Sequence, residues 1–362
     1  MTDFMAKNKE KLEQFAAMSQ AAGSRSDYVQ GGGGNTSVKL ADGLMAIKAS
    51  GYCLSDIRPD KAYAVLDYEA LRRFYYGNEP AQLADVEKLG SACAKENTKL
   101  IEGMDALRPS VEAGFHSILK TFVCHTHSVY ANLAACSTAC CEIAEQAFTG
   151  ADYTWGWVPY TDPGANLTFA IRDELRRVGE KTGKVPSVIL MQNHGIIVHD
   201  DDAERCLAIH ADANERLAQQ FGIHGDSFPA ISVRQTGEEL YEADTPYLRE
   251  ALKNCRYDYK TFIETPLYPD QMVFLIGTFF MDKEGTPAEG ECYADTKTGA
   301  LVLHMGEKKA KTITETLTAV IFIMDTITKM GYTVSTMGEA AKSFIANWES
   351  EKYRKSLAGK KG

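Results

Sequence analysis

Residues 122–127 constrain the fold of this chain most, because a short apolar run there ends in two histidines separated by one residue. The length and composition of the run predict a buried strand. A helical pattern that follows Pro109 places Val111, Phe115 and Ile118 on one face just before this strand. The fold should therefore contain both helices and strands, with this strand in its interior.

Sequence patterns that predict strands and helices lie on both sides of this segment. Two apolar runs flank the pair Asp42-Gly43, which is typical of a β-hairpin. The periodicity predicts further helices at 4–22, 128–147 and 167–181, and strands at 188–191 and 196–198.

The sequence pattern changes after Gly225, and residues 226–262 are polar and mixed. With 362 residues, and roughly 150 per domain as a guide, we expect two units, 1–228 and 229–362, the second packed on the first. In the second unit the pattern predicts strands at 271–281 and 300–304 and helices at 308–330 and 339–355.

Composition excludes several classes of protein. The net charge of −10 comes without a basic stripe, which argues against nucleic-acid or anionic-membrane binding. No segment approaches the roughly 18 apolar residues of a membrane helix, and the charged N-terminus lacks the apolar region of a signal peptide. The nine cysteines show no CxxC spacing, so we expect reduced thiols and a cytoplasmic location.

Three histidines are candidate metal ligands. In a strand, His125 and His127 point to the same side, and two imidazoles so placed can bind Zn²⁺ or a similar divalent ion. His194, within Gln-Asn-His-Gly, would complete a three-ligand site with an open position. The alternatives are two partly exposed histidines at a strand end and a hydrogen-bonded core histidine.

Glu112 and two loops are further candidates. Glu112 begins the helix after Pro109 and is either a metal ligand or general base, or a first-turn glutamate that only stabilises the helix. The backbone of residues 31–37 could bind an anion, although the loop matches neither nucleotide-binding glycine pattern. Lys48, with Ser50 and Gly51, is a second candidate anion contact, unless Lys48 is a solvated strand-end lysine.

Taken in order, these motifs resemble the class II aldolase/adducin family over roughly residues 10–222. Within that family the chain is most similar to the aldolase half of bifunctional rhamnulose-1-phosphate aldolase/lactaldehyde dehydrogenase proteins, although no dinucleotide fingerprint is present. The later part of that half is resembled by Thr265-Pro266, Pro269-Asp270-Gln271 and residues 347–354. The resemblance implies an α/β fold, with three α/β/α layers around a largely antiparallel sheet and a C-terminal α+β extension. The motifs are Gly33-Gly34-Asn35-Thr36-Ser37, Lys48-Ala49-Ser50-Gly51, Ser110-Val111-Glu112, His125-Thr126-His127, Val158-Pro159-Tyr160 with Gly164, and Asn193-His194-Gly195.

The resemblance also implies roles for single residues. The zinc ligands would be His125, His127, His194 and Glu112, and Glu112 would be the acid/base. A catalytic tyrosine, often supplied by a neighbouring subunit, would be Tyr160 or Tyr153, with Tyr160 preferred. Val111 stands where fuculose-type members have a second phosphate-contacting serine. The positions that match the family's phosphate site are Gly34, Asn35, Ser50, Gly51 and Ser110.

The activity that the resemblance implies is reversible retro-aldol cleavage of a ketose 1-phosphate, such as rhamnulose 1-phosphate, to dihydroxyacetone phosphate and an aldehyde. Zn²⁺, or another divalent ion, would be the cofactor, and the protein would form a homotetramer. An epimerase or decarboxylase could use the same metal site, but no aspartate stands beside Ser110 or Glu112 to favour epimerisation. A non-catalytic adducin-like binding module would lack the three histidines.

Overall fold

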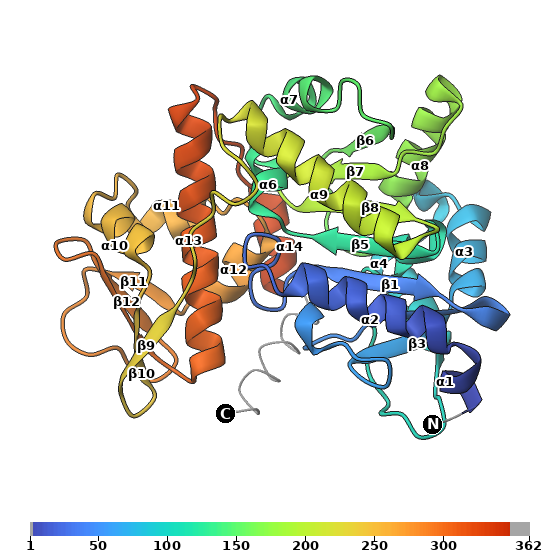
Figure 1. Cartoon of the computed structure of the whole chain (residues 1–362), viewed down its shortest axis with the longest axis horizontal. Helices are drawn as coiled ribbons and strands as arrows, with labels where there is room; N and C mark the ends of the chain where they lie inside the picture. The colour runs from blue at the N-terminus through green and yellow to red at the C-terminus, as the bar shows by residue number, and fades with distance from the viewer. Residues whose placement is uncertain (1–2, 348–362) are drawn as a thin grey trace.

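An eight-stranded sheet forms the centre of the N-terminal part of the chain (Figure 1). The structure is a computed structural model that describes residues 3–347. Neighbouring strands are antiparallel except β6 and β7, which run parallel. From one edge to the other the strands are β4 (Thr98–Lys99), β3 (Tyr63–Asp67), β2 (Leu44–Lys48), β1 (Asn35–Lys39), β5 (Phe122–Thr126), β8 (Gly195–Asp200), β7 (Val188–Met191) and β6 (Trp155–Val158).

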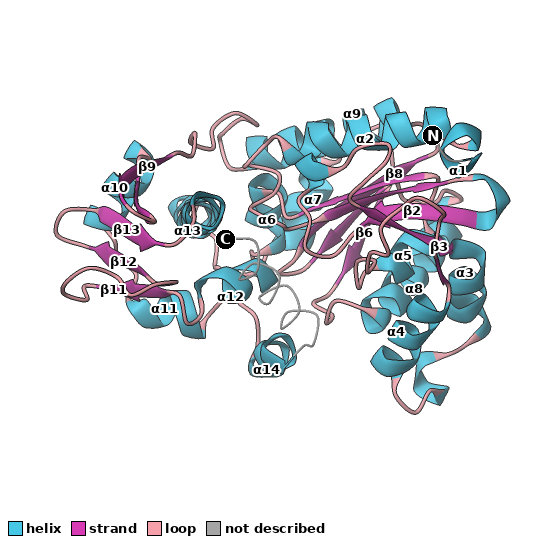
Figure 2. Cartoon of the chain, turned by 90° about the horizontal axis from the view of Figure 1, so that it is seen from below, coloured by secondary structure: helices cyan, strands magenta, loops and turns pink. Residues whose placement is uncertain are grey.

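Helices cover both faces of this sheet (Figure 2). Strand β5 contributes Cys124 to the core on one face and Val123 to the core on the other. The three-layer α/β/α fold with a largely antiparallel sheet is thus confirmed. The first face is covered by α2 (Lys9–Gly23), α6 (Val129–Ala135), α7 (Cys140–Ala147) and α9 (Ala203–Gln220), and the second by α3 (Tyr68–Gly77), α4 (Val86–Glu96), α5 (Ala113–Ile118) and α8 (Ala165–Thr182), while α1 (Asp3–Lys7) precedes α2.

Strand β5 lies in the middle of the sheet, where it pairs with β1 on one side and β8 on the other. The register places Asn35 of β1 and Ile197 of β8 directly beside His125. Residues from three separate parts of the sequence therefore meet at the end of β5.

A second sheet of five strands forms most of the C-terminal part of the chain. Figure 2 shows helix α13 (Glu307–Lys329) end-on between this sheet and the helices of the N-terminal part of the chain. The strand order is β11 (Phe279–Met281), β12 (Cys292–Asp295), β13 (Ala300–His304), β10 (Leu240–Ala243) and β9 (Val233–Gly237), and the helices are α10 (Pro246–Lys253), α11 (Tyr259–Glu264), α12 (Pro269–Leu275), α13 (Glu307–Lys329) and α14 (Glu339–Asn347).

Helix α13 is buried against both parts of the molecule. Leu317, Val320 and Ile321 are at most 1% exposed and share one apolar core with Val129 and Leu133 of α6. Burial of each such side chain contributes about 1.5–3 kcal/mol. The helix expected at 308–330 is confirmed, and its apolar stripe joins the second sheet to the first domain.

The strand expected at 271–281 is wrong. Helix α12 occupies the first part of the segment, and only β11 at its end is a strand. Pro269 stands at the first helical position and Asp270 in the first turn, two features that favour helix initiation. Gly277, at a φ of 74°, reverses the chain before β11.

The other expected elements differ from the structure mainly at their ends. The helix at 4–22 is confirmed but divided at Asn8, the single helix expected at 128–147 is instead the two helices α6 and α7 separated by residues 136–139, and the strand at 300–304 is confirmed. The polar segment 226–262 contains the β9–β10 hairpin and two helices that its mixed pattern does not reveal. The helix expected at 339–355 is present to Asn347, and its remainder lies outside the described residues. Within residues 3–347, no helix has both the length and the apolar character needed to cross a membrane.

Candidate metal centre

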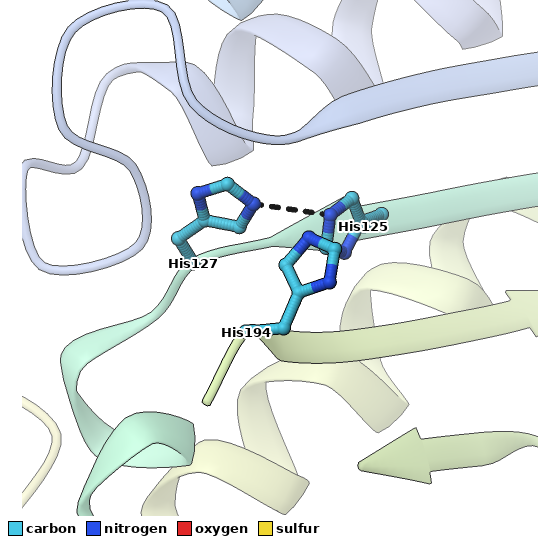
Figure 3. Close-up of side chains that lie close together, drawn as sticks. All are labelled: His125, His127 and His194. Carbon is cyan, nitrogen blue, oxygen red and sulfur yellow. Dashed lines mark hydrogen bonds between the residues drawn. The ribbon is translucent and has the colours of Figure 1, made fainter. Parts of the chain in front are cut away.

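The three candidate histidines converge at the end of β5 (Figure 3). Each of His125, His127 and His194 offers one ligand nitrogen, and these nitrogens lie within 4.8 Å of one another. All three side chains are buried, with at most 6% of any residue exposed. The alternative of two partly exposed histidines is therefore wrong.

Strand periodicity and one sharp turn bring these side chains together. His125 lies in β5 and His127 follows its last residue, so both side chains leave the same face. His194 lies in the turn between β7 and β8, where Asn193 adopts a φ of 51°. The turn presses against β5 so closely that a Cβ atom at Gly195 would lie 2.3 Å from the carbonyl oxygen of Thr126.

Hydrogen bonds orient two of the rings. The Nδ1–H of His125 donates to the carbonyl oxygen of Ile196 at 3.0 Å, and the Nδ1–H of His127 donates to the Oδ2 of Asp270. The two Nε2 atoms lie only 3.2 Å apart, in the contact that the dashed line in Figure 3 marks, and in neutral rings with hydrogen on Nδ1 both of these atoms carry lone pairs. Two lone pairs at this separation repel each other unless a cation binds between them.

Burial keeps the imidazoles of His125 and His194 neutral. Burial lowers the pKa of His125 to about 4 and that of His194 to about 3, despite the opposing effect of Glu112 on both. Neutral imidazole is the form that binds a metal. At neutral pH these two rings are therefore in the state that a metal site requires.

Glu112 faces the same centre. Its Oε1 lies 3.3 Å from the Nε2 of His194 and its Oε2 lies 3.5 Å from the Nε2 of His125. Burial raises the pKa of Glu112, but the two histidines and a 2.6 Å hydrogen bond from Asn35 Nδ2 outweigh it and lower the pKa to about 2. The side chain does not cap α5, so helix stabilisation does not explain its position.

This donor set fits a divalent transition metal. Three imidazole nitrogens and a carboxylate are common zinc ligands. Among the described residues, Glu112 Oε1 and His194 Nδ1 are buried polar atoms without a hydrogen-bond partner. A cation held by Glu112 and the three histidines would give the carboxylate oxygen the partner that it lacks.

The predicted phosphate residues lie beside Glu112 and in the neighbouring loop. Asn35 Nδ2 also donates to the Oγ of Ser110 at 3.2 Å. The backbone N–H of Ser50 donates to Arg108 O at 2.9 Å, next to the bridge between Ala49 and Pro109, so the strand end carrying Ser50 runs alongside the segment carrying Ser110. Gly51 follows at a φ of 86° and is exposed.

The glycine-rich loop is held by other parts of the protein. Gly34 adopts a φ of 65°, and a Cβ there would lie 2.5 Å from the carbonyl oxygen of His125. The N–H of Gly31 donates to the Oε2 of Glu315 at 2.9 Å, so a carboxylate already occupies part of the expected anion cradle. Lys48 is 3% exposed, and its Nζ donates to the carbonyl oxygen of Tyr52 at 2.8 Å, so it is not a solvated lysine.

The two candidate tyrosines contact residues other than the three histidines and Glu112. The Tyr153 hydroxyl donates to Asp212 at 2.8 Å. Tyr160 packs against a small apolar cluster with Met272 and Met337, and its buried hydroxyl has no hydrogen-bond partner among the described residues. Burial raises the pKa of the Tyr160 hydroxyl, and Asp162 raises it further.

Three residues near the metal centre, His116, Asp270 and Tyr268, are not predicted as site residues from the sequence. The Nε2 of His116 contacts the Oδ1 of Asn35 and so directs the amide nitrogen toward Glu112. Asp270 contacts His127, and the ring of Tyr268 lies 6.3 Å from the ring of His127. Asp270 belongs to a resemblance motif, Pro269-Asp270-Gln271, that carries no role for it, and Pro269-Asp270 is also a helix start.

Comparison with models of known protein families shows the family of this chain. The family model described as the class II aldolase and adducin N-terminal domain matches residues 13–221. The chain belongs to this family. The match ends before β9, so the C-terminal extension lies outside the matched region.

Solved structures of the same class are similar to this chain. The N-terminal class II aldolase domain of a conserved Thermoplasma acidophilum protein is 19% identical, with 57% of this chain and 92% of that one covered, at a TM-score of 0.47. An aldolase II superfamily protein from Pseudomonas syringae is 15% identical, with 60% and 75% covered and a TM-score of 0.42. L-fuculose-1-phosphate aldolase from Thermus thermophilus is 15% identical, with 58% of this chain and 93% of that one covered and a TM-score of 0.33. Comparison with curated proteins found no significant match.

Proposed function

We propose that this protein is a zinc-dependent class II aldolase that reversibly cleaves a ketose 1-phosphate, of the rhamnulose 1-phosphate type, to dihydroxyacetone phosphate and an aldehyde. The observation that carries the proposal is the buried convergence of His125, His127 and His194 with the partnerless Oε1 of Glu112. Membership of the class II aldolase and adducin family supports it. The protein would act as a cytoplasmic homotetramer.

Each residue of the centre has a part in this reaction. The three histidines and Glu112 would hold the metal, which when bound supplies a Lewis acid that stabilises negative charge on substrate oxygens. In the cleavage direction Glu112, after taking up a proton from solvent, delivers it to the carbon left by the broken bond. In the synthesis direction its carboxylate, ionised at neutral pH, removes that proton.

The residues around the centre would bind the substrate. The Asn35 amide and the Ser110 hydroxyl, which already contact each other, would bind the phosphate together with Ser50 and the backbone of Gly34 and Gly51. Tyr160 stays a prediction for the acid/base at the C4 oxygen, and its raised pKa keeps the hydroxyl protonated, which suits donation of a proton to the aldehyde oxygen in the synthesis direction.

Two alternatives are less well supported. An adducin-like binding module has no use for three converging imidazoles and a buried carboxylate. An epimerase would be favoured by an aspartate acting as a second acid/base, and Asp270 is indeed near. Its carboxylate, however, is bonded to Nδ1 of His127, the ring nitrogen that does not face His125.

The direct test is an assay of zinc-loaded protein with a panel of ketose 1-phosphates, coupled to detection of dihydroxyacetone phosphate. We expect activity that a chelator abolishes and that added Zn²⁺ restores. His127→Ala should lose most bound zinc and activity, because it removes one of three imidazole ligands. His224→Ala, the same change at an exposed histidine, is the control. If zinc-loaded protein releases no dihydroxyacetone phosphate, or returns epimerised or decarboxylated product instead, the proposal is wrong.

A further inference from the structure

The C-terminal extension reaches into the metal centre through residues 267–271, just before and within α12. Asp270 is 1% exposed, and its Oδ2 accepts the Nδ1–H of His127. The carbonyl oxygen of Leu267 accepts a hydrogen bond from Asn193 Nδ2 at 2.8 Å, next to His194. One short segment of the extension therefore contacts His127 itself and Asn193, the residue that precedes His194.

The surrounding residues make this contact specific. A Cβ atom at Gly33 would lie 2.3 Å from the Oδ2 of Asp270, so the glycine leaves the space that the carboxylate occupies. The hydroxyl of Tyr268 donates to the Oε1 of Gln30 at 3.3 Å, at the start of the same glycine-rich loop. The loop and the extension are thus fitted to each other around His127.

A buried carboxylate on the remote nitrogen of a ligand histidine has a defined effect. It fixes the tautomer with hydrogen on Nδ1, orients the ring, and raises the basicity of Nε2. His127 Nε2 is the atom that lies 3.2 Å from His125 Nε2. His125 receives the corresponding support from the Ile196 carbonyl, which is a weaker acceptor than a carboxylate.

We propose that the extension completes the metal centre, with Asp270 as a positioning residue that holds His127 in its metal-binding orientation and tautomer. This inference rests on the metal site of the proposed function. It assigns part of that site to residues outside the matched family region, 13–221. The extension is then a component of the site, and not only a neighbour in the fold.

The test measures Zn²⁺ affinity of metal-free protein by competition with a chelating indicator at constant pH. Asp270→Asn should weaken zinc binding by roughly 10-fold and Asp270→Ala by up to roughly 100-fold, because the amide still accepts from Nδ1–H while alanine does not. Gly33→Ala should weaken binding as well, because its Cβ would displace the Asp270 carboxylate and would lie only 3.0 Å from His127 Nδ1, so this variant perturbs the whole Asp270–His127 contact while leaving both residues in place. The visible spectrum of Co²⁺-loaded Asp270→Asn should also differ from that of the parent.

Two controls separate positioning from mere docking of the extension. Glu315→Gln alters another extension carboxylate that contacts the glycine-rich loop but no histidine, and it should keep the parent affinity. Asp325→Asn alters a surface carboxylate of the extension and should do the same. The urea midpoint of each metal-free variant reports folding separately.

The outcomes are distinguishable. Parent protein that binds no zinc would overturn the proposed function and this inference with it. Parent protein that binds zinc, with Asp270→Asn and Gly33→Ala equal to it in affinity, would overturn this inference alone. A loss in Glu315→Gln as large as that in Asp270→Asn would also overturn it, because docking of the extension would then account for the effect.

Discussion

Glu112 is the residue on which proton transfer depends in the proposed reaction. Glu112→Gln keeps the size of the side chain but removes its ability to exchange a proton. General acid–base steps contribute roughly 10²–10⁴-fold, so turnover should fall by about that factor. The measurement is the rate of dihydroxyacetone phosphate release at saturating zinc and substrate, with Glu215→Gln, at a glutamate that pairs with exposed His224, as control. An unchanged rate would assign the proton transfer to another group.

Single residues of the centre differ in how far the sequence predicts them. The side-chain period of a strand places His125 and His127 together, because both belong to one short run. His116 and Asp270 escape prediction for the opposite reason. Asp270 lies 143 positions from His127 in the chain, and no local pattern encodes a contact over that separation.

At the scale of secondary-structure elements, hydrophobic periodicity predicts the helices and strands that have one clearly apolar face. The long apolar stripe of α13 is of this kind, whereas β5 is buried on both faces and is predicted from its short apolar run. Residues 272–276 are all apolar, and α12 contacts both α13 and α14, so period alone does not separate helix from strand there. The Pro269-Asp270 start signal favours a helix, and it is the more reliable guide in such a segment.

The contact between the glycine-rich loop and β5 gives a prediction at this scale. Gly34→Ala should destabilise the protein by at least about 1–3 kcal/mol, because alanine at a φ of 65° is strained and its Cβ would meet the His125 carbonyl. Gly179→Ala is the matched control near the end of α8, where nothing lies within 4 Å, and it should stabilise by about 0.5–1 kcal/mol. The urea unfolding midpoint should be lower than that of the parent for Gly34→Ala and higher for Gly179→Ala. A neutral Gly34→Ala would mean that the loop is not pressed against β5.

At the scale of the whole molecule, the two sheets share one continuous apolar core across α13 and α6. The site depends on both sides of that core, since β5 carries His125 and the extension carries Asp270. In the proposed homotetramer, the family resemblance implies that a neighbouring subunit supplies the catalytic tyrosine. Light scattering that gives a strictly monomeric mass would contradict the shared-site expectation and with it a tyrosine supplied by another subunit.

The last prediction concerns removal of the extension. Truncation after residue 228 uncovers the face of α6 that packs on α13, including Val129 and Leu133, and exposed apolar surface of this kind promotes aggregation. It also removes Asp270 from His127 and two carbonyl acceptors, Leu267 O and Ser335 O, from the side chain of Asn193. We therefore expect insoluble or inactive protein. Solubility, zinc content and sedimentation of the fragment check this against the full chain. A fragment that stays soluble but binds zinc weakly would fit the loss of Asp270, because the ligands themselves lie within residues 1–228. A soluble fragment with full zinc affinity and full activity would show that the extension is dispensable to both the fold and the site.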